Sequence, residues 1–72
     1  MKIDYFPDTD TLYIGLTDRP SVESEEAAEG VVLDFDADSR LVGIEIEGAS
    51  QKVELQRLLL AGMPGTVETA AA

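Results

Sequence analysis

Hydrophobic and polar residues alternate along much of the chain from Lys2 to Glu47, and this alternation predicts β-strands. Residues 2–6 and 11–16 alternate on either side of Pro7-Asp8-Thr9-Asp10, a sequence typical of a tight turn, so we expect a first hairpin. Residues 31–35 and 41–47 repeat this arrangement around Asp36, Asp38 and Ser39, which predicts a second hairpin. Because strand side chains alternate between two faces, the hairpins should separate an apolar face from an acidic one.

Two further segments complete the predicted fold. Residues 22–28 are rich in glutamate and fit an edge strand protected by charge, with a short helix behind Ser21 as the alternative. Residues 51–61 are rich in helix formers, and Gly62 and Pro64 follow them, which predicts a C-terminal helix. The expected fold class is therefore α+β: a small antiparallel sheet of two hairpins and an edge strand, with one C-terminal helix packed on it.

The length of 72 residues indicates a single domain, which we place at 1–62, followed by a disordered tail at 63–72. A chain of this size buries only about 60% of the surface of its unfolded form, so its core is small. The sequence has no cysteine and no histidine, which excludes disulfides, thiolate metal sites and histidine catalysis. Oligomerisation or an oxygen-ligated cation remains as a further source of stability.

The charge balance narrows the classes of partner. Fifteen Asp and Glu against five Lys and Arg give a net charge of −10, which repels nucleic-acid phosphates and anionic membranes. A basic protein partner or a divalent cation suits this charge better. The sequence has no signal-peptide pattern at its start and no apolar run of the ~20 residues that a membrane span needs, so we expect a cytoplasmic protein.

Leu58, Leu59 and Leu60 are consecutive within the predicted helix. Three consecutive leucines cover more than half of the circumference of a helix, whereas a helix packed on a sheet buries only one stripe. At least one of the three should therefore be exposed in a monomer. One explanation of the exposed leucine is that Leu60 simply points toward the C-terminal tail. The alternative is a homodimer contact or a docking ridge for another protein.

The acidic segment allows a second interpretation. Asp34, Asp36, Asp38 and Glu45 have the spacing of a calcium-binding loop. However, Ser39 stands where such a loop needs glycine, and the flanking residues predict strands instead of helices. We therefore interpret the segment as a hairpin turn with solvated carboxylates and expect no catalytic, cofactor-binding or metal-binding residue. The alternative is a divalent-cation site or a small carboxylate-dependent enzyme that uses these four residues.

A succession of short motifs resembles a known family over roughly residues 1–60. The motifs are Asp4-Tyr5-x-Pro7-Asp8-Thr9-Asp10-Thr11-Leu12-Tyr13-Ile14, then Gly30-Val31-Val32-Leu33-Asp34-Phe35-Asp36, then Leu41-Val42-Gly43-Ile44-Glu45-Ile46. Their order resembles DUF2283, a family of small bacterial proteins of unknown function, although Ser39 replaces the glycine expected in the second turn.

The resemblance implies a compact β-rich fold and no assigned activity. Some members of the family look like partners of small basic ribonuclease-like proteins that are encoded nearby. The resemblance therefore also implies a basic protein partner. Together with the acidic charge and the leucines at 58–60, it leads us to expect a non-enzymatic interaction module that forms a homodimer. Such a module would act as an antitoxin-like partner of a basic protein.

Overall fold

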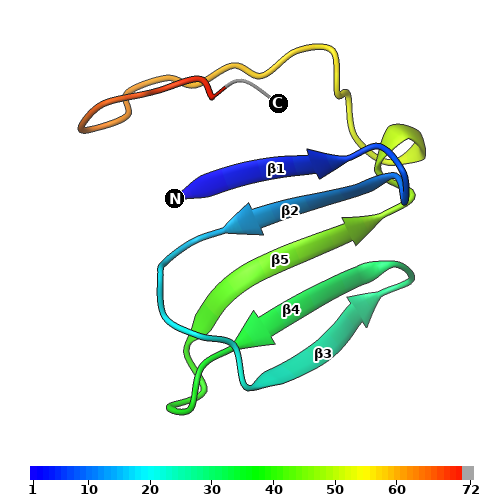
Figure 1. The fold of residues 1–72 in the computed structure, drawn as a ribbon, viewed down its shortest axis with the longest axis vertical. Helices are drawn as coiled ribbons and strands as arrows, with labels where there is room; N and C mark the ends of the chain where they lie inside the picture. Colours follow the sequence, from blue (N-terminus) through cyan, green and yellow to red (C-terminus); the bar gives the residue numbers. More distant parts are fainter. Residues whose placement is uncertain (71–72) are drawn as a thin grey trace.

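The computed structural model describes residues 1–70, and within them the chain forms one five-stranded antiparallel sheet (Figure 1). The strands are β1 (Lys2–Phe6), β2 (Thr11–Gly15), β3 (Glu23–Ala28), β4 (Val31–Phe35) and β5 (Leu41–Glu47). Their order in the sheet is β1-β2-β5-β4-β3, so β5 is central and β1 and β3 are the edges. Both predicted hairpins are confirmed, and residues 22–28 supply the edge strand β3.

The predicted α+β class is wrong, because no C-terminal helix packs on the sheet. The only helical element of residues 1–70 is a short 3₁₀ turn, η1 (Ala49–Gln51), and residues 52–70 then run beyond the β1 edge without regular structure (Figure 1). A helix shorter than ~12 residues is marginal unless one stripe is buried by packing. That burial is missing here, since Leu58, Leu59 and Leu60 are 67%, 74% and 40% exposed.

The domain boundary at residue 62 stays a prediction. Residues 63–70 of the predicted tail carry no strand or helix, and residues 71 and 72 lie outside the described residues. No helix in the described part of the chain is long and apolar enough to cross a membrane.

The strand register sorts side chains onto two faces. One face, called the apolar face below, carries two rows of large apolar side chains that run across four strands. The first row is Ile3, Ile14, Ile44 and Leu33, and the second is Tyr5, Leu12, Ile46 and Val31. The opposite face, called the polar face, carries Tyr13 between Asp4 and Glu45, and Asp34 between Ser24 and Gly43. The predicted separation of the two faces is therefore confirmed.

A network around Asp10 joins the first hairpin turn to the end of β5. The carboxylate of Asp10 accepts hydrogen bonds from the Ser50 hydroxyl at 2.7 Å, the Ser50 N–H at 3.0 Å and the Tyr5 hydroxyl at 2.8 Å. The Ala49 N–H donates to the Asp10 carbonyl at 2.9 Å. These bonds hold Ala49 in the interior, where it and Val42 are the buried hydrophobic residues of the described chain. The fully buried core is thus very small.

Candidate functional site

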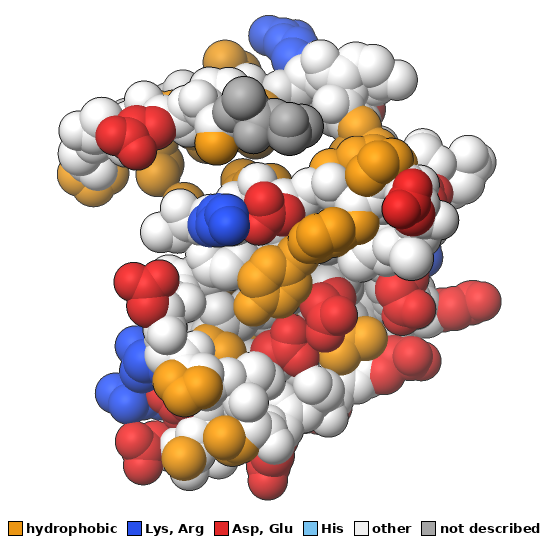
Figure 2. Space-filling model, viewed as in Figure 1, with side chains coloured by type: hydrophobic (Ala, Val, Ile, Leu, Met, Phe, Trp, Pro, Cys, Tyr) orange, Lys and Arg blue, Asp and Glu red, His pale blue; other side chains and the backbone are white. Residues whose placement is uncertain are grey.

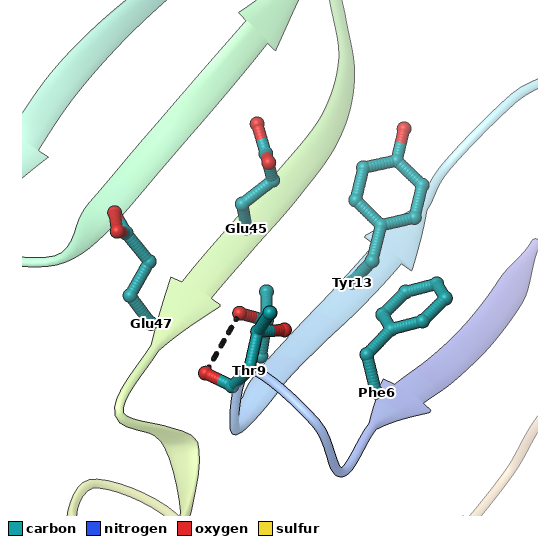
Figure 3. Close-up of a pocket in the computed structure, with 6 residues that line it drawn as sticks. Phe6, Thr9, Tyr13, Glu45 and Glu47 are labelled. Atoms are coloured by element: carbon teal, nitrogen blue, oxygen red, sulfur yellow. Dashed lines mark hydrogen bonds between the residues drawn. The ribbon is translucent and has the colours of Figure 1, made fainter.

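An open hollow of about 710 Å³ lies on the polar face over β1, β2 and β5 (Figure 3). Its walls come from Phe6, Thr9, Thr11, Tyr13, Glu45 and Glu47. The register explains this grouping, because Tyr13 lies directly opposite Glu45 and Thr11 lies opposite both Phe6 and Glu47. Two aromatic rings therefore lie beside two carboxylates. Figure 2 shows acidic and hydrophobic side chains intermingled over the middle of the sheet.

Gly43 makes room for the ring of Tyr13. A Cβ atom at position 43 would lie 2.8 Å from Cζ of Tyr13, closer than real Cβ contacts allow, so any side chain here would displace the ring. The aromatic ring thus covers the backbone of the central strand β5. A glycine inside a predicted strand is the sequence signal for such a close approach, but it does not name the side chain that fills the space.

Asp34 and Glu45 form a close pair of carboxyl groups next to the hollow. Asp34 is only 5% exposed, and its carboxylate accepts a hydrogen bond of 2.6 Å from the Ser24 hydroxyl on β3. Burial raises the pKa of Glu45, and a hydrogen bond with Asp34 and the negative charges of Asp34 and Glu47 raise this pKa further. Asp34 therefore lies on the polar face, but it is buried between neighbouring strands, whereas the sequence predicts a solvated carboxylate.

Replacing Asp34 with asparagine is expected to lower the pKa of Glu45. The change removes one of the two negative charges that raise this pKa, while the effect of burial remains, so the value should fall but stay above its usual range. Carboxyl-carbon NMR titration of the side chain measures this shift. Asp38→Asn is the matched control and should leave the titration of Glu45 unchanged, because Asp38 does not perturb Glu45. An unchanged pKa in Asp34→Asn would contradict the pairing.

Asp36 organises the turn between β4 and β5. It is 5% exposed, and its carboxylate accepts hydrogen bonds of 2.9 Å from the backbone N–H groups of Asp38 and Arg40. It also pairs with Arg19 Nε at 2.7 Å and with Arg40 Nε at 3.1 Å. The bond from the Arg40 N–H contributes most to lowering the pKa of Asp36 to about 2, and the Arg19 side chain adds to it. Asp36 is therefore a structural carboxylate within its own ion-pair network.

The structure brings Asp34 and Glu45 together, but it does not gather all four residues of the calcium-loop pattern. Asp34 pairs with Ser24, Asp36 lies between two arginines, and Asp38 is exposed and pairs only with Arg40. Within residues 1–70 no group of three or more acidic side chains is placed to hold a metal ion. Ser39 takes the left-handed conformation expected of glycine, with φ of 61°, so the turn closes without glycine.

These features define a class: a small all-β protein built as a single antiparallel layer, with an acidic, aromatic-lined hollow on one face. A family model described as "Protein of unknown function (DUF2283)" matches residues 2–50. The chain belongs to the DUF2283 family, as the order of its motifs indicates. The matched region contains all five strands and ends within η1, before the irregular C-terminal segment. Comparisons with curated proteins and with solved structures gave no significant match.

Proposed function

We propose that this chain is a non-enzymatic binding module that recognises a basic protein partner through the hollow on the polar face. The observation that supports this most directly is the pairing of Glu45 and Glu47 with the rings of Phe6 and Tyr13. Carboxylates beside aromatic rings suit a guanidinium or ammonium group, which gains an ion pair and a cation–π contact together. An arginine or lysine side chain of the partner is therefore the expected occupant.

The electrostatics of the hollow favour the same occupant. The ion pairs of the described residues use Lys2, Arg19 and Arg40, and none of these pairs reaches Glu45 or Glu47. The raised pKa of Glu45 reflects burial together with repulsion by Asp34 and Glu47, and an incoming cation would relieve that repulsion. The net charge of −10 also speeds the approach of a basic partner. A module that occupies a basic protein in this way would be antitoxin-like.

Neutralising both glutamates is expected to weaken binding of a short arginine-rich peptide by about tenfold. Two ion pairs at the rim of the open hollow, of ~0.5–1 kcal/mol each, correspond to this factor. The variant is Glu45→Gln/Glu47→Gln, and calorimetric titration measures the affinity. The matched control is Glu26→Gln/Glu29→Gln at the end of β3, which changes the net charge by the same amount away from the hollow. We expect the control to lose clearly less affinity.

Equal losses in the two variants would mean that only net charge matters, and would contradict a site in the hollow. NMR shift mapping of the wild-type protein with the same peptide gives an independent test. The largest shifts should fall at Phe6, Tyr13 and Glu45. Purification from the native host then tests the biological claim, because a basic protein should accompany the wild type and the β3 control but not the Glu45→Gln/Glu47→Gln variant.

A further inference from the structure

The middle of the apolar face is left uncovered in the single chain. None of the eight side chains in its two rows is buried, and Ile3 and Tyr5 are each 42% exposed. Within residues 1–70 no helix and no second sheet lies over them, since every strand belongs to the same layer. Stable domains bury the apolar side of a sheet against a second layer. The second layer is therefore missing from the single chain.

The C-terminal segment covers only the edge of this face. Residues 53–58 lie near the β1–β2 end, where they leave a gap of about 340 Å³ against Ile3, Tyr5, Leu12 and Ile14. The apolar side chains of β4 and β5 are not part of this gap. Leu55 of the segment is half-buried, but Leu58 points largely to solvent, with 67% of its surface exposed. The segment thus adds apolar surface to the face instead of closing it.

We propose that the apolar face binds the same face of a second copy of this chain, so that two single sheets form a two-layer β-sandwich. Aligned sheets pack about 10 Å apart through interdigitating side chains, as these two rows would. Five strands at ~4.8 Å spacing and ~17 Å length give a flat area of about 400 Å². This is about half of the ~800 Å² that each partner buries in a standard interface, and the exposed side chain of Leu58 beside β1 adds apolar surface to it.

The distribution of charge favours a second copy over a basic partner at this face. The eight row positions carry no charge, and carboxylates of this face such as Glu25 and Glu54 lie at its edges. A basic protein therefore finds no carboxylate in the middle of the face, whereas two identical apolar rows match each other. The first row ends at Glu25 on β3, while Arg57 lines the gap beside β1 at the opposite edge. A two-fold axis parallel to the strands places β3 over the partner's β1, which brings Glu25 toward Arg57. The acidic polar faces then lie on the outside of the dimer.

Light scattering coupled to size-exclusion chromatography tests this proposal on the full chain. The wild type is expected at twice its 7.7 kDa mass. Leu33→Thr places a hydroxyl in the first row, introduces a β-branched residue that suits a strand, and should shift the protein to monomer. Val32→Thr is the matched control, because Val32 is the preceding residue of the same strand and faces the other side. It should remain dimeric. Circular dichroism confirms that each variant retains its β-sheet.

A wild type that is monomeric at every concentration overturns the proposal. The proposal is also overturned if Leu33→Thr and Val32→Thr both fold and form dimers to the same extent. If Leu33→Thr fails to fold, Arg57→Glu supplies the second test, since it lies outside the sheet and should raise the dimer dissociation constant. A dimer that appears only when residues 53–72 are removed would make the C-terminal segment the occupant of the face, and would also overturn the proposal. The hollow lies on the opposite face, so these outcomes are independent of partner binding there.

Discussion

Replacing Val42 with alanine is expected to lower the free energy of unfolding by about 2 kcal/mol. Val42 is 1% exposed and is the largest fully buried side chain of the described residues. The backbone around it is fixed as well, since its carbonyl accepts a 2.8 Å hydrogen bond from the Leu16 N–H. The cavity left by the two methyl groups therefore cannot close easily. A loss of this size is a large fraction of the stability of a small domain.

Urea denaturation at a fixed protein concentration measures this effect, because self-association would make the apparent stability depend on concentration. Val22→Ala is the matched control: the same side chain is 59% exposed there, so the change should stay within about 0.5 kcal/mol. Similar losses at both positions would contradict a core centred on Val42.

The sheet could be predicted from the sequence because its signals are local. Alternation with a period of two determines which residues of a strand share a face, and the Pro7–Asp10 and Asp36–Ser39 turns fix where strands end. The glutamates of residues 22–28 identified an edge strand for the same reason, since edge strands commonly carry charge. Each of these signals acts within a few residues and does not depend on distant contacts.

The helix prediction failed because helix propensity is also local, whereas helix stability is not. Residues 51–61 have good helix formers, yet a short helix needs a surface that buries one stripe of it. In the single chain the leucines at 58–60 do not pack against the apolar face and remain exposed. The expectation that at least one of them is exposed holds for all three, but in an irregular segment, because the helix that carried the prediction is absent.

The burial of Asp34 and Asp36 could not be predicted from the sequence, because it depends on residues that only the fold brings near. Asp36 meets Arg19 across 17 positions of sequence, and Asp34 meets Ser24 across 10. The alternation of the strands is enough to put Asp34 and Glu45 on the same face. It does not show that the two carboxyl groups lie so close together that Asp34 raises the pKa of Glu45. The same limit applies to Tyr13, whose position over Gly43 follows from the pairing of β2 with β5.

Acid is expected to remove the stabilising contribution of Asp36. Its pKa falls from the ordinary 3.8 to about 2 in the folded protein, so the unfolded chain binds this proton more tightly. The contribution is therefore fully present above pH 3.8 and is lost as the pH falls toward about 2. Asp10 acts in the same direction, because hydrogen bonds from Ser50 and Tyr5 lower its pKa as well.

Thermal unfolding of Asp36→Asn across this pH range isolates the effect. At neutral pH the variant should melt below the wild type, because Arg19 and Arg40 lose their carboxylate partner. The difference should shrink as the pH approaches about 2, where the wild-type carboxyl group becomes neutral too. Asp38→Asn removes an exposed carboxylate from the same turn and should show only a small difference at every pH. If the difference in melting temperature between the wild type and Asp36→Asn did not change with pH, the stabilising contribution assigned to the ionised Asp36 carboxylate would be contradicted.

Glu45 should change the stability in the opposite direction, and at a higher pH than Asp36. Its pKa is raised in the folded protein, so the folded state binds this proton more tightly than the unfolded chain and stability increases as the pH falls through the raised value. Stability is therefore expected to rise on mild acidification and then to fall once Asp36 protonates. Glu45→Gln should abolish the rise and keep the later fall, which separates the two carboxyl groups in one experiment. The carboxylate that limits stability near neutral pH is also the one that a cationic partner would neutralise.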